Sequence, residues 1–238
     1  MDIYNIKLEF DHEAFRKTLE RCVEERGKGY VCVVDGTVLR MAQEDMEYRQ
    51  IIRNALVNTC DGSSLAMMCN KIYKTNYTAY PGPTVFKHYI EKPYRHLIIG
   101  NTEEAVERVR TTAKEKGVEC DLHHVDVPFK KVEEFDYDGI AEQVNAIGAD
   151  MIWVSLGAPK QERFMARLLP KIEHGVMFGV GAAVNYYIGE IESSKNPKLM
   201  WLKRIQTEPK KQIKRAWAYI KVLPKIYKEE KRRAASKQ

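Results

Sequence analysis

The sequence predicts an α/β fold with a mostly parallel sheet, helices on both faces of that sheet, and a basic helical C-terminal appendage. β-rich runs alternate with stretches of helical periodicity, which favours parallel strand pairing in a Rossmann-like, doubly wound sheet. Residues 201–238 contain thirteen Lys or Arg against three Glu, a net charge of +10, whereas residues 1–200 carry −4. We therefore expect an α/β domain over 1–194, which carries the candidate site, and the basic appendage over 195–238.

The first expected elements are a helix and a strand. Asp11 is a suitable N-cap, and Phe15 and Leu19 then fall on one helical face. The run 30–34 is β-rich, and a helical stretch follows near 44–56.

Five more strands are expected, separated by helices. These strands lie near Thr78, in the run ending at Gly100, in the run starting at Asp121, and in the runs ending at Gly157 and Gly181. One helix is capped by Thr102, and two others cover 137–149 and 159–172. In doubly wound sheets ligands bind beyond the carboxyl ends of the strands, so the loops after these runs are the candidate site.

Several classes of protein are disfavoured. The N-terminal stretch lacks the basic and apolar regions of a signal peptide, and no apolar run approaches the ~20 residues of a membrane span, so we expect a cytoplasmic protein. Five cysteines without a CxxC pair disfavour a disulfide framework or a zinc site. The Asp-x-Asp pattern of Asp136 and Asp138 could hold a metal–nucleotide, but Asp138 is better interpreted as a helix N-cap.

The segment VNTCDGSSLAMM raises a specific question about Asp61. An Asp-Gly pair is ordinarily a turn, and Ser63 can begin a helix after it. A carboxylate in such a turn can also act as a general base. The residues alone leave both interpretations open.

The segment MIWVSLGAPKQE has the pattern of a strand, a loop and a helix. Gly157 lets a ligand approach the backbone, Pro159 sets the turn, and the N–H groups of a helix starting at Lys160 favour anions. Gln161 can donate and accept hydrogen bonds. The FGVGAAV segment around Gly181 repeats the arrangement but lacks the third glycine of a dinucleotide fingerprint.

These motifs, in this order, resemble the WecG/TagA/CpsF family of bacterial glycosyltransferases, glycosyltransferase family 26. The resemblance spans roughly 30–217. The matching segments are VNTCDGSSLAMM, YPGPTVF, HLIIGN, VNAIGADMIWVSLGAPKQERFMARLLP, FGVGAAVNYYIG and NPKLMWLKRIQTEPKK.

The resemblance implies an inverting transferase that uses a UDP-sugar donor. The sugar is often of the N-acetylmannosamine type, with a related hexose or uronic acid as variants, and the acceptor is a saccharide on undecaprenyl diphosphate. The products are cell-surface polysaccharides or teichoic acids, and no cofactor or metal is required. Catalytic roles fall on Asp61 and Gln161. Substrate-binding roles fall on Asp35, Gly62, Gly82, Gly100, Gly157, Pro159, Lys160, Gly181, Asn185, Lys195, Arg204 and Lys211.

The appendage predicts a peripheral location at the inner face of the cell membrane. Past Pro209, apolar residues including Trp217 repeat at helical spacing between lysines and arginines, which is typical of a basic amphipathic helix on an anionic membrane surface. A helix docked on the body, with its basic face in solvent, explains the same pattern. An apolar face could also form a homo-oligomer interface, and no nucleic-acid-binding motif accompanies the charge.

Departures from the family pattern keep an alternative open. Val33 and Asp35 stand where the family often has Thr-x-Asn, Asn185 replaces an aspartate, and Lys195 lies in SSKNP where Arg-Ala-Pro is usual. Lys is a point charge where Arg is a bidentate fork. The alternative is a non-catalytic nucleotide-sugar-binding α/β protein, and within the transferase hypothesis Asp35 is the second candidate for the base.

Overall fold

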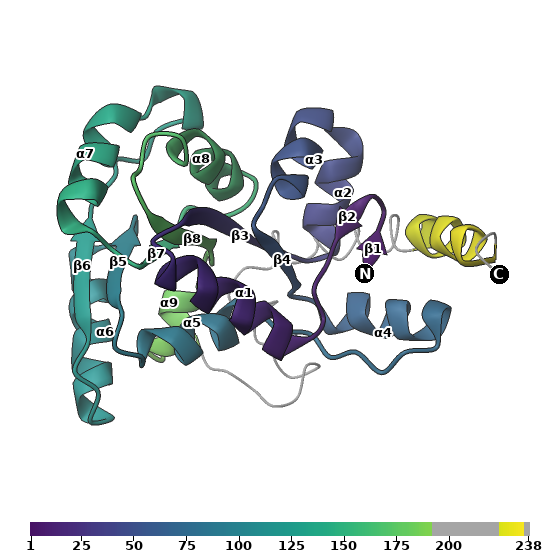
Figure 1. Ribbon diagram of the computed structural model, residues 1–238, viewed down its shortest axis with the longest axis horizontal. Coiled ribbons are helices and arrows are strands. Elements are labelled where there is room, and N and C mark those ends of the chain that lie inside the picture. The colour runs from purple at the N-terminus through teal and green to yellow at the C-terminus, as the bar shows by residue number, and fades with distance from the viewer. Residues whose placement is uncertain (192–223, 236–238) are drawn as a thin grey trace.

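The computed structural model describes residues 1–191 and 224–235 and has a parallel sheet at its centre (Figure 1). Within these residues six strands run in the order β4-β3-β8-β7-β5-β6, and every neighbouring pair is parallel. The strands are β3 Lys28–Val34, β4 Val57–Cys60, β5 Arg95–Ile99, β6 Asp121–Val125, β7 Met151–Val154 and β8 Gly175–Gly179. A small antiparallel hairpin, β1 Asp2–Ile3 and β2 Ile6–Lys7, precedes the sheet.

Helices cover both faces of the sheet, as the alternating pattern predicts (Figure 1). On one face α2 Gly36–Glu44, α3 Met46–Arg53, α4 Ser63–Tyr73, α7 Tyr137–Ile147 and α8 Lys160–Leu168 contribute to one buried core. On the other face α1 His12–Glu24, α5 Gly82–Ile90, α6 Glu103–Glu115 and α9 Ala183–Tyr187 form a second core. Strand residues alternate between the two: Tyr30 and Cys32 belong to the first core and Val31 to the second.

N-cap residues in the sequence correctly predicted where two helices begin. Asp11 and Thr102 accept hydrogen bonds from the first-turn N–H groups of α1 and α6, as expected for N-caps. The helix expected near 44–56 is α3, whereas α2 before it was not predicted; Asp45 ends α2 and caps α3.

Two element predictions were wrong, and one strand was missed. No strand forms near Thr78, although Tyr80 N–H donates to the Cys60 carbonyl at 2.8 Å. The strand on this side is instead β4, which immediately precedes Asp61. The N-cap of α7 is Asp136, which accepts a hydrogen bond from Gly139 N–H at 3.0 Å, whereas Asp138 lies in the first turn.

A buried histidine makes folding sensitive to acid. His96 is fully buried, its Nε2 lies 3.2 Å from the Lys92 carbonyl, and Trp153 Nε1–H donates to its Nδ1 at 3.3 Å. These partners suit a neutral ring with the proton on Nε2, because a second proton on Nδ1 would face the indole N–H. Burial lowers the pKa of His96 from 6.5 to about 4.

We expect the free energy of unfolding to fall as the pH drops from about 6.5 to about 4. The unfolded state binds the His96 proton in that window and the folded state does not, so stability is complete above it. The loss attributable to this group is about 3 kcal/mol. Urea unfolding of wild type and His96→Gln at pH 7 and pH 4.5 measures it. Equal pH dependence of the two proteins would contradict the assignment.

The C-terminal helix, residues 224–235, docks on the N-terminal hairpin and α4, away from β6 and α7 (Figure 1). Ile226 and Glu230 are fully buried. The Glu230 carboxylate accepts hydrogen bonds from Tyr4 N–H at 2.9 Å and Tyr73 Oη–H at 2.5 Å, and Arg233 Nη1 lies 3.3 Å away. The described part of the appendage thus contacts the body; the amphipathic stretch predicted past Pro209, up to residue 223, lies outside the described residues.

We expect Glu230→Ala to release this helix. The change leaves the Tyr4 N–H and the Tyr73 hydroxyl without their acceptor, and breaking such a buried network costs about 3 kcal/mol. Hydrogen exchange over 224–235 should rise in Glu230→Ala and stay at the wild-type level in Lys228→Ala, a change at an exposed position of the same helix. Unchanged exchange in Glu230→Ala would show that Glu230 does not anchor the helix.

Candidate active site at the carboxyl edge of the sheet

The sheet register brings the predicted loops to one edge. Val34 pairs with Cys60, Ile99 with Val154, and Val154 with Gly179. The residues that follow these strands, among them Asp35 and Asp61, therefore emerge side by side. The strand pairing also continues into the loops, where Asp61 N–H donates to the Val34 carbonyl at 2.9 Å.

Helices leave this edge toward opposite faces of the sheet at two topological switch points. After β5 the chain enters α6 on one face, whereas after the neighbouring β7 it enters α8 on the other. The adjacent strands β3 and β8 diverge in the same way, toward α2 and α9. Such switch points are where ligands bind in doubly wound sheets.

Asp61 projects its carboxylate across this edge. Its Oδ1 accepts a hydrogen bond from Gly82 N–H, the first residue of α5, at 3.0 Å. The N-cap of α4 is Gly62, so the Asp61 side chain does not cap the helix that follows it. The turn interpretation accounts for the backbone but not for the side chain, which α5 holds at the edge.

Asp35 occupies the equivalent position after β3 and has a clear structural role. It is the N-cap of α2, and its Oδ1 accepts hydrogen bonds from Thr37 N–H and Val38 N–H, both at 2.8 Å. Gly82 lies near the same strand ends, since a Cβ on it would be 3.5 Å from a Val33 methyl group and 3.7 Å from the Val180 carbonyl oxygen. Asp35, Asp61 and Gly82 are thus brought together.

Gln161 connects the two glycine loops. Its Oε1 accepts hydrogen bonds from Gly157 N–H at 3.0 Å and Gly181 N–H at 3.1 Å. Its Nε2 donates to the Gly179 carbonyl at 2.8 Å and to Glu162 Oε1 at 2.9 Å. Gln161 is 4% exposed, and its carboxamide uses its full hydrogen-bonding capacity within the protein. Gln161 therefore acts as a brace that fixes the distance between the Gly157 and Gly181 loops. The N–H groups of both glycines already donate to Gln161.

The loops that Gln161 joins lie at the β5–β7 switch point, where a doubly wound sheet is expected to bind its ligand, and we call this place the β5–β7 crevice. Gly157 has φ +74°, a conformation that favours glycine, and no atom lies within 4 Å of the place of a Cβ. Ala158 and Pro159 beyond it are exposed. Gly100, which follows β5, lies against Leu156 and the Ser155 carbonyl. The Ser155 hydroxyl donates to the Gly181 carbonyl at 2.7 Å and ties the β7 loop to the β8 loop.

Two predicted binding residues have other neighbours in the described structure. The Lys160 ammonium lies 5.1 and 4.8 Å from the ring centroids of Phe129 and Phe135. Asn185 Nδ2 donates to Glu190 Oε2 at 2.6 Å, and Glu190 also pairs with Arg108. Lys195, Arg204 and Lys211 lie outside the described residues.

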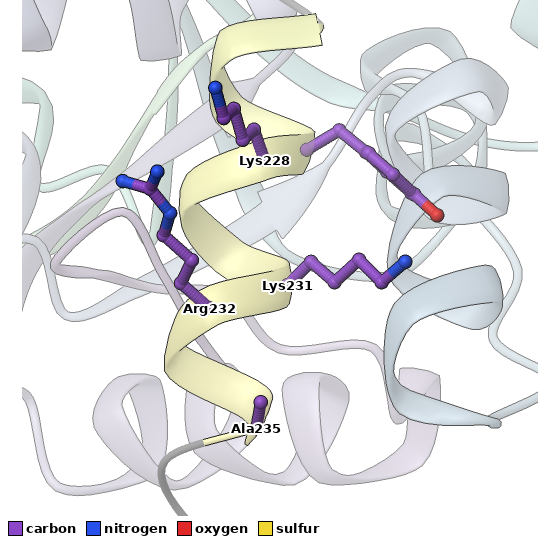
Figure 2. Close-up of a pocket in the computed structure, with 5 residues that line it drawn as sticks. Lys228, Lys231, Arg232 and Ala235 are labelled. Carbon is purple, nitrogen blue, oxygen red and sulfur yellow. The ribbon is translucent and has the colours of Figure 1, made fainter.

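The outer side of the C-terminal helix is strongly basic. Lys228, Lys231 and Arg232, with Tyr227 and Ala235, line an open surface cavity of about 450 Å³. Figure 2 shows Lys228 and Arg232 extending to one side of the helix and Lys231 to the other. We refer to Lys228, Lys231 and Arg232 as the cationic face.

Sequence reasoning missed Glu162, a fully buried carboxyl next to Gln161. Its signal was present in the helical spacing: Gln161 and Glu162 are followed at three or four residues by Phe164 and Met165, which are both buried. Two polar residues on the apolar side of a helix require internal partners.

The match to known families covers nearly the whole chain. The family model of the glycosyl transferase WecG/TagA/CpsF family matches residues 1–236. Over the described ranges, no helix is long and apolar enough to cross a membrane, and no group of three or more His, Cys, Asp or Glu side chains is arranged to hold a metal ion. With the motifs assembled at one edge of a parallel sheet, this match shows that the chain belongs to the WecG/TagA/CpsF family of glycosyltransferases, which act in cell-surface polysaccharide biosynthesis.

Proposed function

We propose that this protein is an inverting glycosyltransferase that moves an N-acetylhexosamine, or a related hexose or uronic acid, from a UDP-sugar to a polyprenyl-diphosphate-linked saccharide. The observation that carries the proposal is the Asp61 carboxylate, held by Gly82 N–H at the carboxyl edge of the sheet, where the glycine loops also end. Family membership supplies the reaction class.

Asp61 acts as the general base. An acceptor hydroxyl is a poor nucleophile and must lose its proton as its oxygen bonds to the anomeric carbon. The proton passes to the Asp61 carboxylate, the new C–O bond forms, and the bond from the anomeric carbon to the diphosphate oxygen breaks. UDP leaves with the electron pair, and a single displacement inverts the anomeric centre.

The donor diphosphate occupies the β5–β7 crevice. This placement follows from the exposed rim at Ala158 and Pro159 and from the start of α8 directly behind it. Because Gly157 and Gly181 N–H groups are bonded to Gln161, these two glycines shape the crevice and do not donate to the phosphates. We propose that transfer needs no metal and that charge on the leaving diphosphate is stabilised by helix N–H groups and side-chain cations.

The enzyme binds its lipid-linked acceptor at an anionic membrane surface. The cationic face is exposed to solvent, whereas Glu230 of the same helix is docked on the hairpin and α4. Each cation near an anionic surface contributes about 1 kcal/mol to membrane attachment. The proposed location is therefore peripheral, at the inner face of the cell membrane.

The test is UDP release with a panel of UDP-N-acetylhexosamines, UDP-hexoses and UDP-uronic acids, and a short-chain diphospholipid saccharide as acceptor. Acceptor-dependent release that persists in EDTA is expected for one donor class. UDP binding without transfer across the whole panel would support a non-catalytic nucleotide-sugar-binding protein. Absence of both binding and transfer would overturn the proposal, and loss of transfer in EDTA would overturn its metal-independent part.

A further inference from the structure

A buried carboxyl group lies directly behind the Gln161 brace. Glu162, in the first turn of α8, is fully buried, and its Oε1 accepts the hydrogen bond from Gln161 Nε2 at 2.9 Å. This bond matters for the direction of the Gln161 carboxamide. With acceptors at Glu162 and Gly179, the NH2 end faces inward and the oxygen faces the two glycine N–H groups. A reversed carboxamide would set N–H against N–H at both glycines.

The Glu162 carboxyl also lies beside a buried tyrosine hydroxyl. Tyr48, from α3, is 1% exposed, and its hydroxyl interacts with the Glu162 carboxyl. Within the described part of the chain, neither Tyr48 Oη nor Glu162 Oε2 has a hydrogen-bond partner of full geometry. A hydrogen bond between these two side chains would satisfy both atoms.

The charges around Glu162 oppose ionisation. Burial raises the pKa of the Glu162 carboxyl most, and the nearby Asp35 carboxylate raises it further, whereas the Gln161 amide and the Tyr48 hydroxyl act in the opposite direction. The Cys32 thiol, on β3, is buried on the same side and interacts with Glu162. The neighbouring cation, Arg163, stacks over the Tyr48 ring and pairs with Asp45 and Glu47 instead. An unpaired buried carboxylate is costly, so the neutral acid is favoured.

We propose that Glu162 is a positioning residue that, as an uncharged carboxylic acid, orients the Gln161 carboxamide and so fixes the spacing of the Gly157 and Gly181 loops. Its Oε1 accepts from Gln161, and its Oε2–H donates to the Tyr48 oxygen. Glu162 touches no substrate. It acts on the crevice through Gln161, and the link to substrate rests on the proposed function.

Amide hydrogen exchange at Gly157 and Gly181 tests the proposal without any substrate. Glu162→Gln keeps an oxygen for Gln161 and a donor for Tyr48, whereas Glu162→Met keeps the volume and removes both. We expect exchange at both glycines to rise about tenfold in Glu162→Met, as for loss of one hydrogen bond, and to stay within about threefold of wild type in Glu162→Gln. Exposed Glu142→Gln on α7 is the matched control, and α6 amides report global folding.

Each outcome decides the proposal. Wild-type exchange in Glu162→Met would overturn the positioning role, and a Glu162→Gln protein as mobile as Glu162→Met would overturn the uncharged state. If Glu162→Met does not fold, the carboxyl 13C shift of Glu162 in the wild type at pH 7 decides: the shift of a protonated acid supports the proposal and that of a carboxylate overturns it.

UDP titration then tests whether the Gln161 brace affects nucleotide binding in the β5–β7 crevice. UDP affinity should fall about tenfold in Glu162→Met and be restored in Glu162→Gln, in parallel with the exchange rates. If wild-type protein binds no UDP, the proposed function fails while the exchange result still decides the role of Glu162. Equal UDP affinity in both variants, with altered exchange in one, would overturn the link between brace and nucleotide.

Discussion

Asp61→Asn should lower the turnover number for sugar transfer at least about a hundredfold, which is the contribution expected of a general base. The amide is nearly the same size and can still accept the Gly82 N–H through its oxygen, so the geometry after β4 is retained. What is lost is the ability to take the acceptor proton. UDP affinity should therefore stay within about threefold of wild type, because the nucleotide gains nothing from the base. Steady-state rates and UDP calorimetry separate the two effects.

Asp35→Asn provides the matched control for this change. Asp35 follows β3 as Asp61 follows β4, at paired positions of the same edge, and asparagine is as good an N-cap as aspartate. Its turnover number should remain within about tenfold of wild type. A large loss in Asp35→Asn with a normal Asp61→Asn would move the base to Asp35 and reduce Asp61 to a turn residue. Large losses in both would mean that the two carboxylates act as a pair.

The fold was predictable because its signals are local. Strand runs, caps such as Asp11 and Thr102, and helical periodicity each depend on a few neighbouring residues. The short strand β4 was missed because four residues with a polar Asn58 give little alternation. Asn58 is nevertheless buried, since its Nδ2 donates to the Ile52 carbonyl at 2.9 Å and the Lys7 carbonyl at 3.1 Å. Those partners come from separate segments, and a local pattern does not contain them.

The sequence predicted which residues lie at the candidate site better than it predicted the directions of their side chains. Asp61, Gln161 and the glycines emerge at one edge because parallel strands end together, which the strand order implies. Lys160 and Asn185 are different: both lie near the right loops, but their side chains meet Phe129 and Glu190. Side-chain direction depends on tertiary neighbours, so a motif alone does not determine it. The catalytic role predicted for Gln161 stays a prediction, beside the bracing role that its four hydrogen bonds show.

We expect Gly175→Ala to be strongly destabilising, because it adds a methyl group at the start of β8, the strand that leads into the site. Gly175 begins β8 with φ +104°, a backbone conformation that costs an alanine about 1–3 kcal/mol. A Cβ there would also lie 2.5 Å from the Ala149 carbonyl oxygen and 3.0 Å from Ile152 Cδ1. The carbonyl cannot easily move away, because the next residue, Asp150, is bonded on both sides: its N–H donates to the Arg95 carbonyl and its carbonyl accepts from Val176 N–H, both at 2.9 Å.

We expect Gly175→Ala to lower the free energy of unfolding by about 3–5 kcal/mol, the sum of backbone strain and overpacking. Gly117→Ala is the control, because Gly117 has φ +74° but no atom lies within 4 Å of the place that an alanine methyl group would take, so it should lose about 1 kcal/mol from strain alone. Urea unfolding of both variants measures the difference, which isolates the clash with Ala149. Equal losses would mean that the backbone at 149–150 moves to make room for the methyl group. The pairing of β7 with β8 would then be more flexible than its hydrogen bonds indicate. The larger loss expected in Gly175→Ala would instead show that β8, and with it the Gly179 carbonyl that Gln161 uses, is held rigidly from its first residue.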